Sequence, residues 1–141
     1  MKIVLVAGIA WLIAQLLKLL LTWIHTKKIN LYAMFASGGM PSSHTSFVIA
    51  MTTKMGLQEG FSSPFFALAL CFSLIVMYDA AGVRHAVGLQ AQMLNVLIDE
   101  YNDENKVDIE RVKEILGHTP TQVLAGIFLG ILVGVVGHQI I

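Results

Sequence analysis

Four apolar runs separated by polar segments dominate the pattern of the 141-residue chain. The first run covers residues 3–24 around Gln15 and Lys18, and a helix of that length spans roughly 33 Å, enough to cross a bilayer. It is longer than the ~7–15-residue apolar core of a signal peptide, and no small-residue cleavage site follows, so we interpret it as a transmembrane helix. The other runs predict helices over 44–57, 65–83 and 122–141.

The polar segments 25–43 and 84–120 are expected to lie outside the hydrocarbon of the membrane. Within the second segment, residues 86–98 predict an amphipathic helix on the bundle or the membrane interface, because their apolar positions recur with a helical period: Val87, Ala91, Leu94 and Ile98. A further short helix is expected over 108–116, with Gly117 at the position that follows its C-terminus.

The composition is that of a membrane protein. Hydrophobic residues make up 56% of the chain and charged residues 13%, against about 25% charged residues in ordinary globular domains, and the mean hydropathy is +0.74. Disorder and a nucleic-acid-binding arm are excluded, the single cysteine Cys71 cannot form an internal disulfide, and no zinc-type Cys/His spacing occurs. We expect an all-α integral membrane helical bundle of about four transmembrane helices plus one or two short amphipathic helices. It would form a single domain over residues 1–141 and bind no nucleic acid.

The charges are unevenly distributed although the formal net charge is zero. Residues 99–114 hold seven of the nine acidic residues, so the rest of the chain is basic, which favours an anionic ligand. If the short second helix crosses the membrane, both polar segments lie on one side with most of the basic residues: Lys27, Lys28, Arg84, Lys106, Arg111 and Lys113. The positive-inside rule then predicts that this face is cytoplasmic, and we expect the protein in the cell membrane. If the second helix is re-entrant instead, the two polar segments face opposite sides.

Two short motifs each place a histidine at the start of an apolar helix. In GGMPSSHTS, the glycines, including Gly39, allow a tight turn, Ser42 or Ser43 can cap the helix, and His44 lies in the first helical turn. Free backbone N–H groups and the positive end of the helix dipole make such a terminus a ready anion site. A capped helix with a histidine at the water boundary is the alternative interpretation.

The second motif, GHTPTQ, repeats this physical arrangement. Pro120 suits the first helical position, Thr119 and Gln122 can form a reciprocal capping box, and His118 lies one residue outside the helix. Two histidines at two converging helix starts indicate a functional site more strongly than either does alone.

Ionisable residues inside or beside membrane helices are costly and usually functional. Lys18 shares a semi-polar helix face with Gln15, which indicates that it faces the bundle. Asp79 and Arg84 are five residues apart, so they are not neighbours on a regular helix unless the chain bends at Gly82. Arg84 is interpreted either as part of an ion pair at a helix end or as a clamp that holds a phosphate through two parallel hydrogen bonds.

Two further features carry weaker expectations. Lys54 is expected near the far membrane surface without a role in the site. Glycines at positions 126, 130 and 134 form a small-residue face suited to close helix contact, either within the chain or in a homodimer.

Three strings, GGMPSSHTS, YDAAGVRHAVGLQA and LGHTPTQVLAG, resemble the divergent branch of the type 2 phosphatidic acid phosphatase superfamily. That superfamily includes lipid phosphate phosphatases, acid phosphatases and vanadium haloperoxidases, and its pattern is K-x6-R-P, P-S-G-H and S-R-x5-H-x3-D. In PSSH, Ser43 replaces the glycine of the second element, and Gln122 replaces the final aspartate of the third. The arginines of the pattern are not matched by position.

The resemblance implies hydrolysis of a lipid phosphate or pyrophosphate through a phosphohistidine, without a metal or other cofactor. His118 would be the nucleophile, and His44 would donate a proton to the leaving oxygen. Other residues would hold the phosphoryl group or support the histidines: Lys18, Arg84, Gly39, Ser42 and Ser43 for the phosphate, Asp79 and Gln122 for orientation. The alternatives are a catalytically weak or inactive membrane protein that binds phosphate or lipid, and a small channel or transporter subunit.

Overall fold

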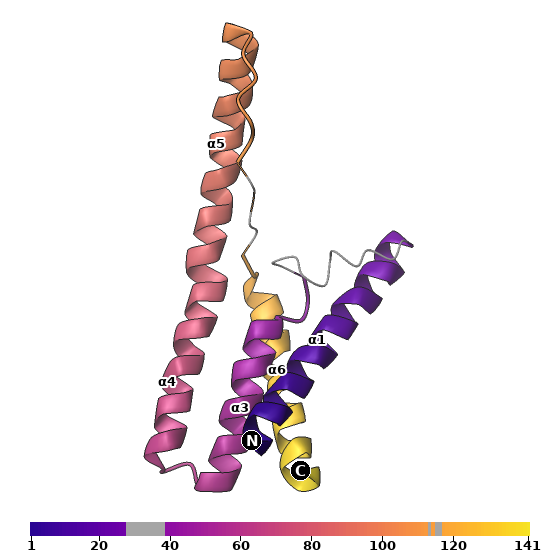
Figure 1. Ribbon diagram of the computed structural model, residues 1–141, viewed down its shortest axis with the longest axis vertical. Helices are drawn as coiled ribbons and strands as arrows, with labels where there is room; N and C mark the ends of the chain where they lie inside the picture. Colours follow the sequence, from indigo (N-terminus) through magenta and orange to yellow (C-terminus); the bar gives the residue numbers. More distant parts are fainter. Residues whose placement is uncertain (28–38, 113, 115–116) are drawn as a thin grey trace.

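The computed structural model describes residues 1–27, 39–112, 114 and 117–141, and the regular structure in these residues is helical throughout (Figure 1). The elements, in chain order, are α1 (Lys2–Thr26), α3 (Ser43–Glu59), α4 (Pro64–Tyr78), the π-helical turn η1 (Asp79–Val83), α5 (Arg84–Asn105) and α6 (Pro120–Ile140). The predicted all-α bundle is confirmed.

The 17-residue helix α3 lies at the centre and packs against α1, α4 and α6. The chain runs one way along α1 and α4 and back along α3 and α6, so that both termini lie at the same end of the bundle (Figure 1). Among the described residues, three helices are long and apolar enough to cross a membrane: α1, the continuous helix Pro64–Asn105, and α6. Seventeen residues of α3 reach only ~26 Å, and its neighbours shield it from lipid.

Close packing of α6 on α3 depends on glycine. A Cβ at Gly126 would lie 2.7 Å from the Ser42 carbonyl oxygen, and one at Gly130 would lie 2.7 Å from Cβ of Ile49. In lipid, the hydrophobic effect does not drive helices together. Small residues favour association instead, because they let the helix backbones approach closely. Of the two alternatives for this glycine face, the structure therefore shows the contact within the chain.

Small polar side chains join α3 to α4. The Thr52 and Ser73 hydroxyl oxygens are 2.7 Å apart, and both hydroxyls reach the Val48 carbonyl. Both side chains are buried, and because every hydroxyl finds a partner, this polar contact avoids the cost of an unpaired group in an apolar surrounding.

Lys54 lies at the end of the bundle far from the histidines, as expected, but its side chain is buried. Its side chain is 3% exposed, and its Nζ donates a hydrogen bond to the Gly137 carbonyl at 3.4 Å. That carbonyl belongs to the last turn of α6, where the helix dipole favours a cation. Lys54 is thus a buried contact between α3 and α6 rather than a surface lysine.

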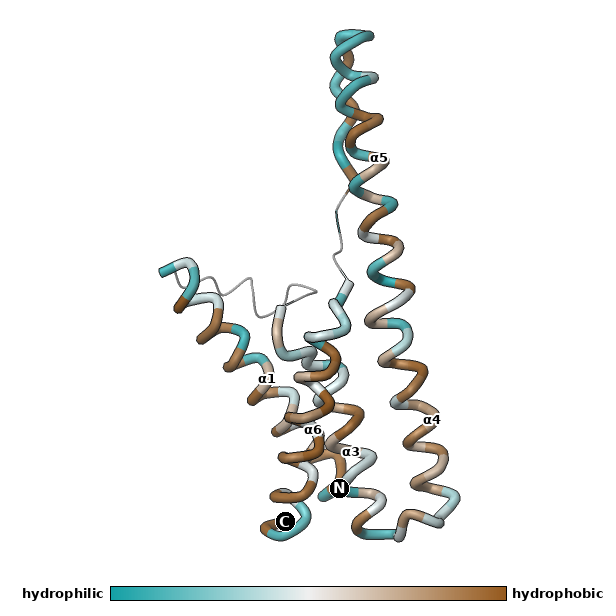
Figure 2. Tube along the Cα trace, turned by 180° about the vertical axis from the view of Figure 1, so that it is seen from behind, coloured by the Kyte–Doolittle hydropathy of each residue, from teal (hydrophilic) through white to brown (hydrophobic). Residues whose placement is uncertain are grey.

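The third apolar helix does not end at residue 83. The chain passes through η1 without interruption into α5, and the resulting 42-residue helix is ~63 Å long, about twice the thickness of the hydrocarbon. Hydrophilic residues gather along its outer half (Figure 2). The predicted helix over 86–98 is thus part of α5, but Val87 and Leu94 of its apolar stripe are exposed.

Residues 107–112 form no helix, contrary to the expectation for 108–116, of which residues 113, 115 and 116 lie outside the described residues. Two asparagines of α5 bind this returning segment instead. Asn95 accepts from the Val112 N–H and donates to the Val112 carbonyl, and Asn102 does the same with Ile109. These bonds occupy backbone groups that a helix would pair internally.

The glycine contact yields a stability prediction. Gly130→Ala should destabilise the protein by about 1–3 kcal/mol, because the new Cβ meets α3 and forces the helices apart. Gly8→Ala is the matched control, since a Cβ there meets nothing within 4 Å and the change should be neutral or stabilising by up to ~1 kcal/mol. Thermal unfolding in detergent, followed by circular dichroism, measures both. A melting temperature of Gly130→Ala equal to that of the wild-type protein would show that the packing of α6 does not depend on this contact.

Candidate active site

Two imidazoles meet at the end of the bundle opposite the chain termini. His44 lies in the first turn of α3, and His118 lies two residues before α6. Their ring centroids are 6.3 Å apart and their planes are inclined by 58°. His118 is 4% exposed, whereas His44 is exposed. The separation allows both rings to contact one small ligand, each at a hydrogen-bonding distance of about 3 Å.

Gln122 orients His118. The predicted capping box is present: the Thr119 hydroxyl accepts from the Gln122 N–H, and Gln122 Oε1 accepts from the Thr119 N–H. The same Oε1 lies 3.2 Å from Nδ1 of His118. Because an amide oxygen only accepts, Nδ1 carries the proton in the neutral ring, and the lone pair of Nε2 is left available.

Ser42 joins the two helix starts. Its backbone N–H donates to the Gln122 carbonyl at 3.0 Å, and its hydroxyl oxygen accepts from the N–H and the hydroxyl of Thr45. Ser42 is completely buried. Its polar groups are used to cap α3 and to fix α3 against α6, so we assign it a structural role rather than a contact with phosphate.

Lys18 reaches the site from α1. Its side chain is 4% exposed, and Nζ donates to the Ser43 hydroxyl at 3.4 Å, at the positive end of α3. Gly39, with φ of +83°, lies beside the Lys18 alkyl chain. That left-handed conformation favours glycine, and it brings the loop before α3 against the lysine.

The π-helical turn η1 brings together residues that a regular helix would separate. Widening the helix to i→i+5 hydrogen bonding puts residues five apart on one face, and the Arg84 Nε donates to Asp79 Oδ2 at 2.7 Å. The Arg84 N–H bonds to the Asp79 carbonyl. The Ala80 carbonyl accepts instead from the His118 N–H at 2.9 Å.

Gly117 permits this docking of the loop. A Cβ at position 117 would lie 2.2 Å from the His85 backbone nitrogen and 2.6 Å from the carbonyl carbon of Arg84. The structure thus gives Gly117 a role in the close approach of the loop to the start of α5, whereas the sequence predicted it at the end of a helix whose last residues lie outside the described residues.

The surroundings hold His118 in its neutral form. Burial lowers the pKa of the imidazole below its usual value of 6.5, the hydrogen bond with Gln122 acts in the opposite direction, and the positive charges of Lys18, His44 and Arg84 lower it further. Near pH 7 the ring is thus uncharged, which is the form that can act as a nucleophile.

The structure brings most of the predicted residues into one cluster. His44, His118 and Gln122 are joined by the helix starts, Lys18 and Ser43 lie beside them, and Asp79 and Arg84 form an ion pair in η1. The Ala80 carbonyl and Gly117 were missed. The five-residue spacing of Asp79 and Arg84 was the available signal for the π-helical turn.

The fold and the paired histidines define a helical membrane protein with a polar site at one end of the bundle. Over residues 1–133 the chain matches the model of the Divergent PAP2 family. It is also 35% identical over 138 residues to the uncharacterized membrane protein YuiD of Bacillus subtilis (strain 168), a match that covers 90% of this chain and 87% of that protein. No solved structure matches it. The chain belongs to the divergent PAP2 family, which confirms the resemblance seen in the sequence.

The orientation of His118 by Gln122 can be tested by NMR titration of the labelled imidazole. We expect its pKa to lie below 6.5 in the native protein, to rise in Gln122→Glu and to fall in Gln122→Ala. Glutamate keeps the capping box and adds a negative charge beside Nδ1, whereas alanine removes the hydrogen bond. The same pKa in all three proteins would mean that residue 122 does not contact the ring.

Proposed function

We propose that the protein is a membrane phosphatase that hydrolyses a lipid phosphate or pyrophosphate through a phosphohistidine, without a metal ion. The observation that carries the proposal is the pairing of His44 and His118 at two converging helix starts, 6.3 Å between ring centroids. Membership of the divergent PAP2 family supports the same chemistry. Because the site lies beside apolar helices, an amphipathic substrate is favoured.

In the first step, Nε2 of His118 attacks phosphorus and the bond from phosphorus to the leaving oxygen breaks. Protonated His44 donates its proton to that oxygen, which departs as an alcohol or as a phosphate. In the second step, water attacks the phosphohistidine, His44 accepts a proton from it, and the N–P bond breaks to release inorganic phosphate. His118 returns to the neutral form that Gln122 orients.

Charge on the phosphoryl oxygens would be stabilised by Lys18, by Arg84 and by the free N–H groups in the first turn of α3. Arg84 uses Nε for its bond to Asp79, which fixes the guanidinium while its terminal nitrogens remain available for a two-point contact with phosphate. We place this face in the cytoplasm of a cell membrane protein by the positive-inside rule.

One observation favours a second function, that of a phosphate- or lipid-binding protein with weak or no catalysis. The partner of His118 is the neutral amide of Gln122, which stabilises a developing imidazolium less than a carboxylate would. Such a protein would bind phosphate without releasing product.

Release of inorganic phosphate by the purified protein, with a chelator present, tests the two functions. Lipid phosphates and isoprenyl pyrophosphates form the substrate panel. His118→Ala should abolish release, and His44→Ala should reduce it by about 10²–10⁴-fold. His138→Ala is the matched control, because His138 is exposed in the last turn of α6. Release that survives His118→Ala would contradict the mechanism, and phosphate binding without any release would favour the second function.

The role of Arg84 gives a separate prediction. Arg84→Lys should lower kcat/KM about tenfold or more, because lysine cannot make two parallel hydrogen bonds to one phosphate, and a charged hydrogen bond contributes about 1.5–3 kcal/mol. Arg111→Lys provides the comparison, since Arg111 is also exposed and paired with acidic residues but lies beyond α5. Equal effects of the two substitutions would exclude the two-point contact.

A further inference from the structure

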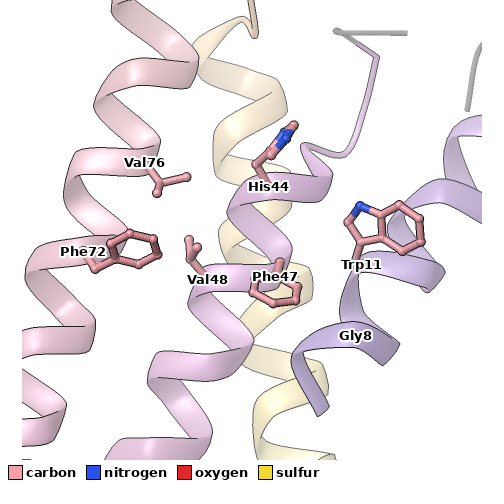
Figure 3. Close-up of a pocket in the computed structure, with 7 residues that line it drawn as sticks. All are labelled: Gly8, Trp11, His44, Phe47, Val48, Phe72 and Val76. Atoms are coloured by element: carbon pink, nitrogen blue, oxygen red, sulfur yellow. The ribbon is translucent and has the colours of Figure 1, made fainter. Parts of the chain in front are cut away.

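An apolar groove opens directly beside His44. It has a volume of about 440 Å³ and is lined from α1, α3 and α4 by Gly8, Trp11, Phe47, Val48, Phe72 and Val76, with His44 at its edge. Figure 3 shows Phe72 and Val76 pointing from α4 toward α3, and Trp11 extending from α1 into the space beside Phe47. Trp11 and Phe72 are 37% and 50% exposed, so the groove is open along its side.

The groove is apolar, whereas its edge at His44 is polar. Apart from His44, every lining side chain is apolar, whereas Lys18, Ser43 and the start of α3 lie next to His44. A ligand that fits both parts has an anionic head and a hydrocarbon tail. Because His44 belongs to both parts, the atom that receives its proton must be the one that joins head to tail.

The volume of the groove matches that of one hydrocarbon chain. A methylene occupies about the ~30 Å³ of a liquid water molecule, so 440 Å³ corresponds to roughly fifteen methylenes. Two long acyl chains side by side exceed that space. Moving a methylene from lipid into the groove gains little free energy, because lipid is also apolar, so the groove serves chiefly to position the ester bond.

We propose that this groove binds the hydrocarbon chain of a single-chain lipid phosphate and thereby places its ester oxygen against His44. The inference rests on the proposed function, and it narrows the substrate class to a phosphate monoester of one long-chain alcohol. A diacyl lipid phosphate would leave one chain outside the groove.

Binding can be measured without turnover. The chain has two tryptophans, so Trp23→Phe leaves Trp11 as the single fluorescent tryptophan. The fluorescence of Trp11 then reports on the groove. Vesicles of phosphatidylcholine would contain either a dodecyl phosphonate brominated near the middle of its chain or the equally brominated dodecanol, at equal membrane concentration. We expect the phosphonate to quench Trp11 at least twofold more strongly, because only its head is held by the cationic site.

Filling the groove should remove that difference. Gly8→Phe can be accommodated, since a Cβ at Gly8 meets nothing within 4 Å, and Val76→Phe narrows the groove from α4. Leu16→Phe is the control, because Leu16 is 52% exposed on α1 and does not line the groove. Equal quenching by the two probes, or a difference that persists in both groove variants, would overturn the proposal.

Turnover provides an independent comparison. The kcat/KM for dodecyl phosphate should exceed that for phosphatidic acid and for glycerol phosphate at least tenfold, and Gly8→Phe should reduce this preference. Equal values for one-chain and two-chain substrates would overturn the single-chain assignment. No release from any substrate would contradict the proposed function alone, because the quenching difference would still decide whether the groove binds the chain.

Discussion

The close approach of α6 to α3 is the contact on which the rest of the structure depends. Glycines on one face of α6 bring its backbone against α3 at Ser42, Ser46 and Ala50. At the upper end of this contact, the Ser42 N–H binds the Gln122 carbonyl. The same packing that buries a polar central helix therefore also fixes two helix starts side by side, and the pairing of His44 with His118 follows from it.

The site combines groups that are held rigidly with groups that are exposed. His118 is held by its hydrogen bond to Gln122 of the capping box, by the Ala80 carbonyl and by burial. A nucleophile that must keep one nitrogen free requires such fixed positioning. His44 and Arg84 are exposed, as groups that meet a ligand entering from the membrane need to be. The apolar groove begins at the edge formed by His44, and Lys18 lies beside the neighbouring Ser43.

Much of the fold could be predicted because apolar runs and caps are local signals. The helix start at Pro120 followed from the Thr119–Gln122 capping box, and the bundle-facing position of Lys18 followed from the stripe that it shares with Gln15. The burial of Lys54 was not predicted because hydropathy does not show which neighbour covers a side chain. The returning segment after α5 was misjudged for a related reason: its conformation is fixed by Asn95 and Asn102, whose partners lie seventeen and seven residues away.

The continuity of α4 with α5 was hidden for another reason. An apolar run that ends in glycine and charged residues is typical of a helix terminus, and it is equally compatible with a π-helical turn. The apolar periodicity cannot distinguish a helix terminus from a π-helical turn. The turn contains only five residues, and after it the apolar positions follow a shifted register in the sequence. The pairing of Asp79 with Arg84 distinguishes them, and the five-residue spacing of the two residues is its signal in the sequence.

The π-helical turn also limits how the chain can vary in length. Removing one residue from Asp79–Val83 would restore regular helical winding and leave the orientation of α5 almost unchanged, because the π-helical turn winds its five residues through about the same angle as four residues of an α-helix. The Ala80 carbonyl would then pair within its own helix rather than with the His118 N–H. Relatives that share this site should therefore conserve the number of residues between Asp79 and Arg84 more strictly than the identity of those residues.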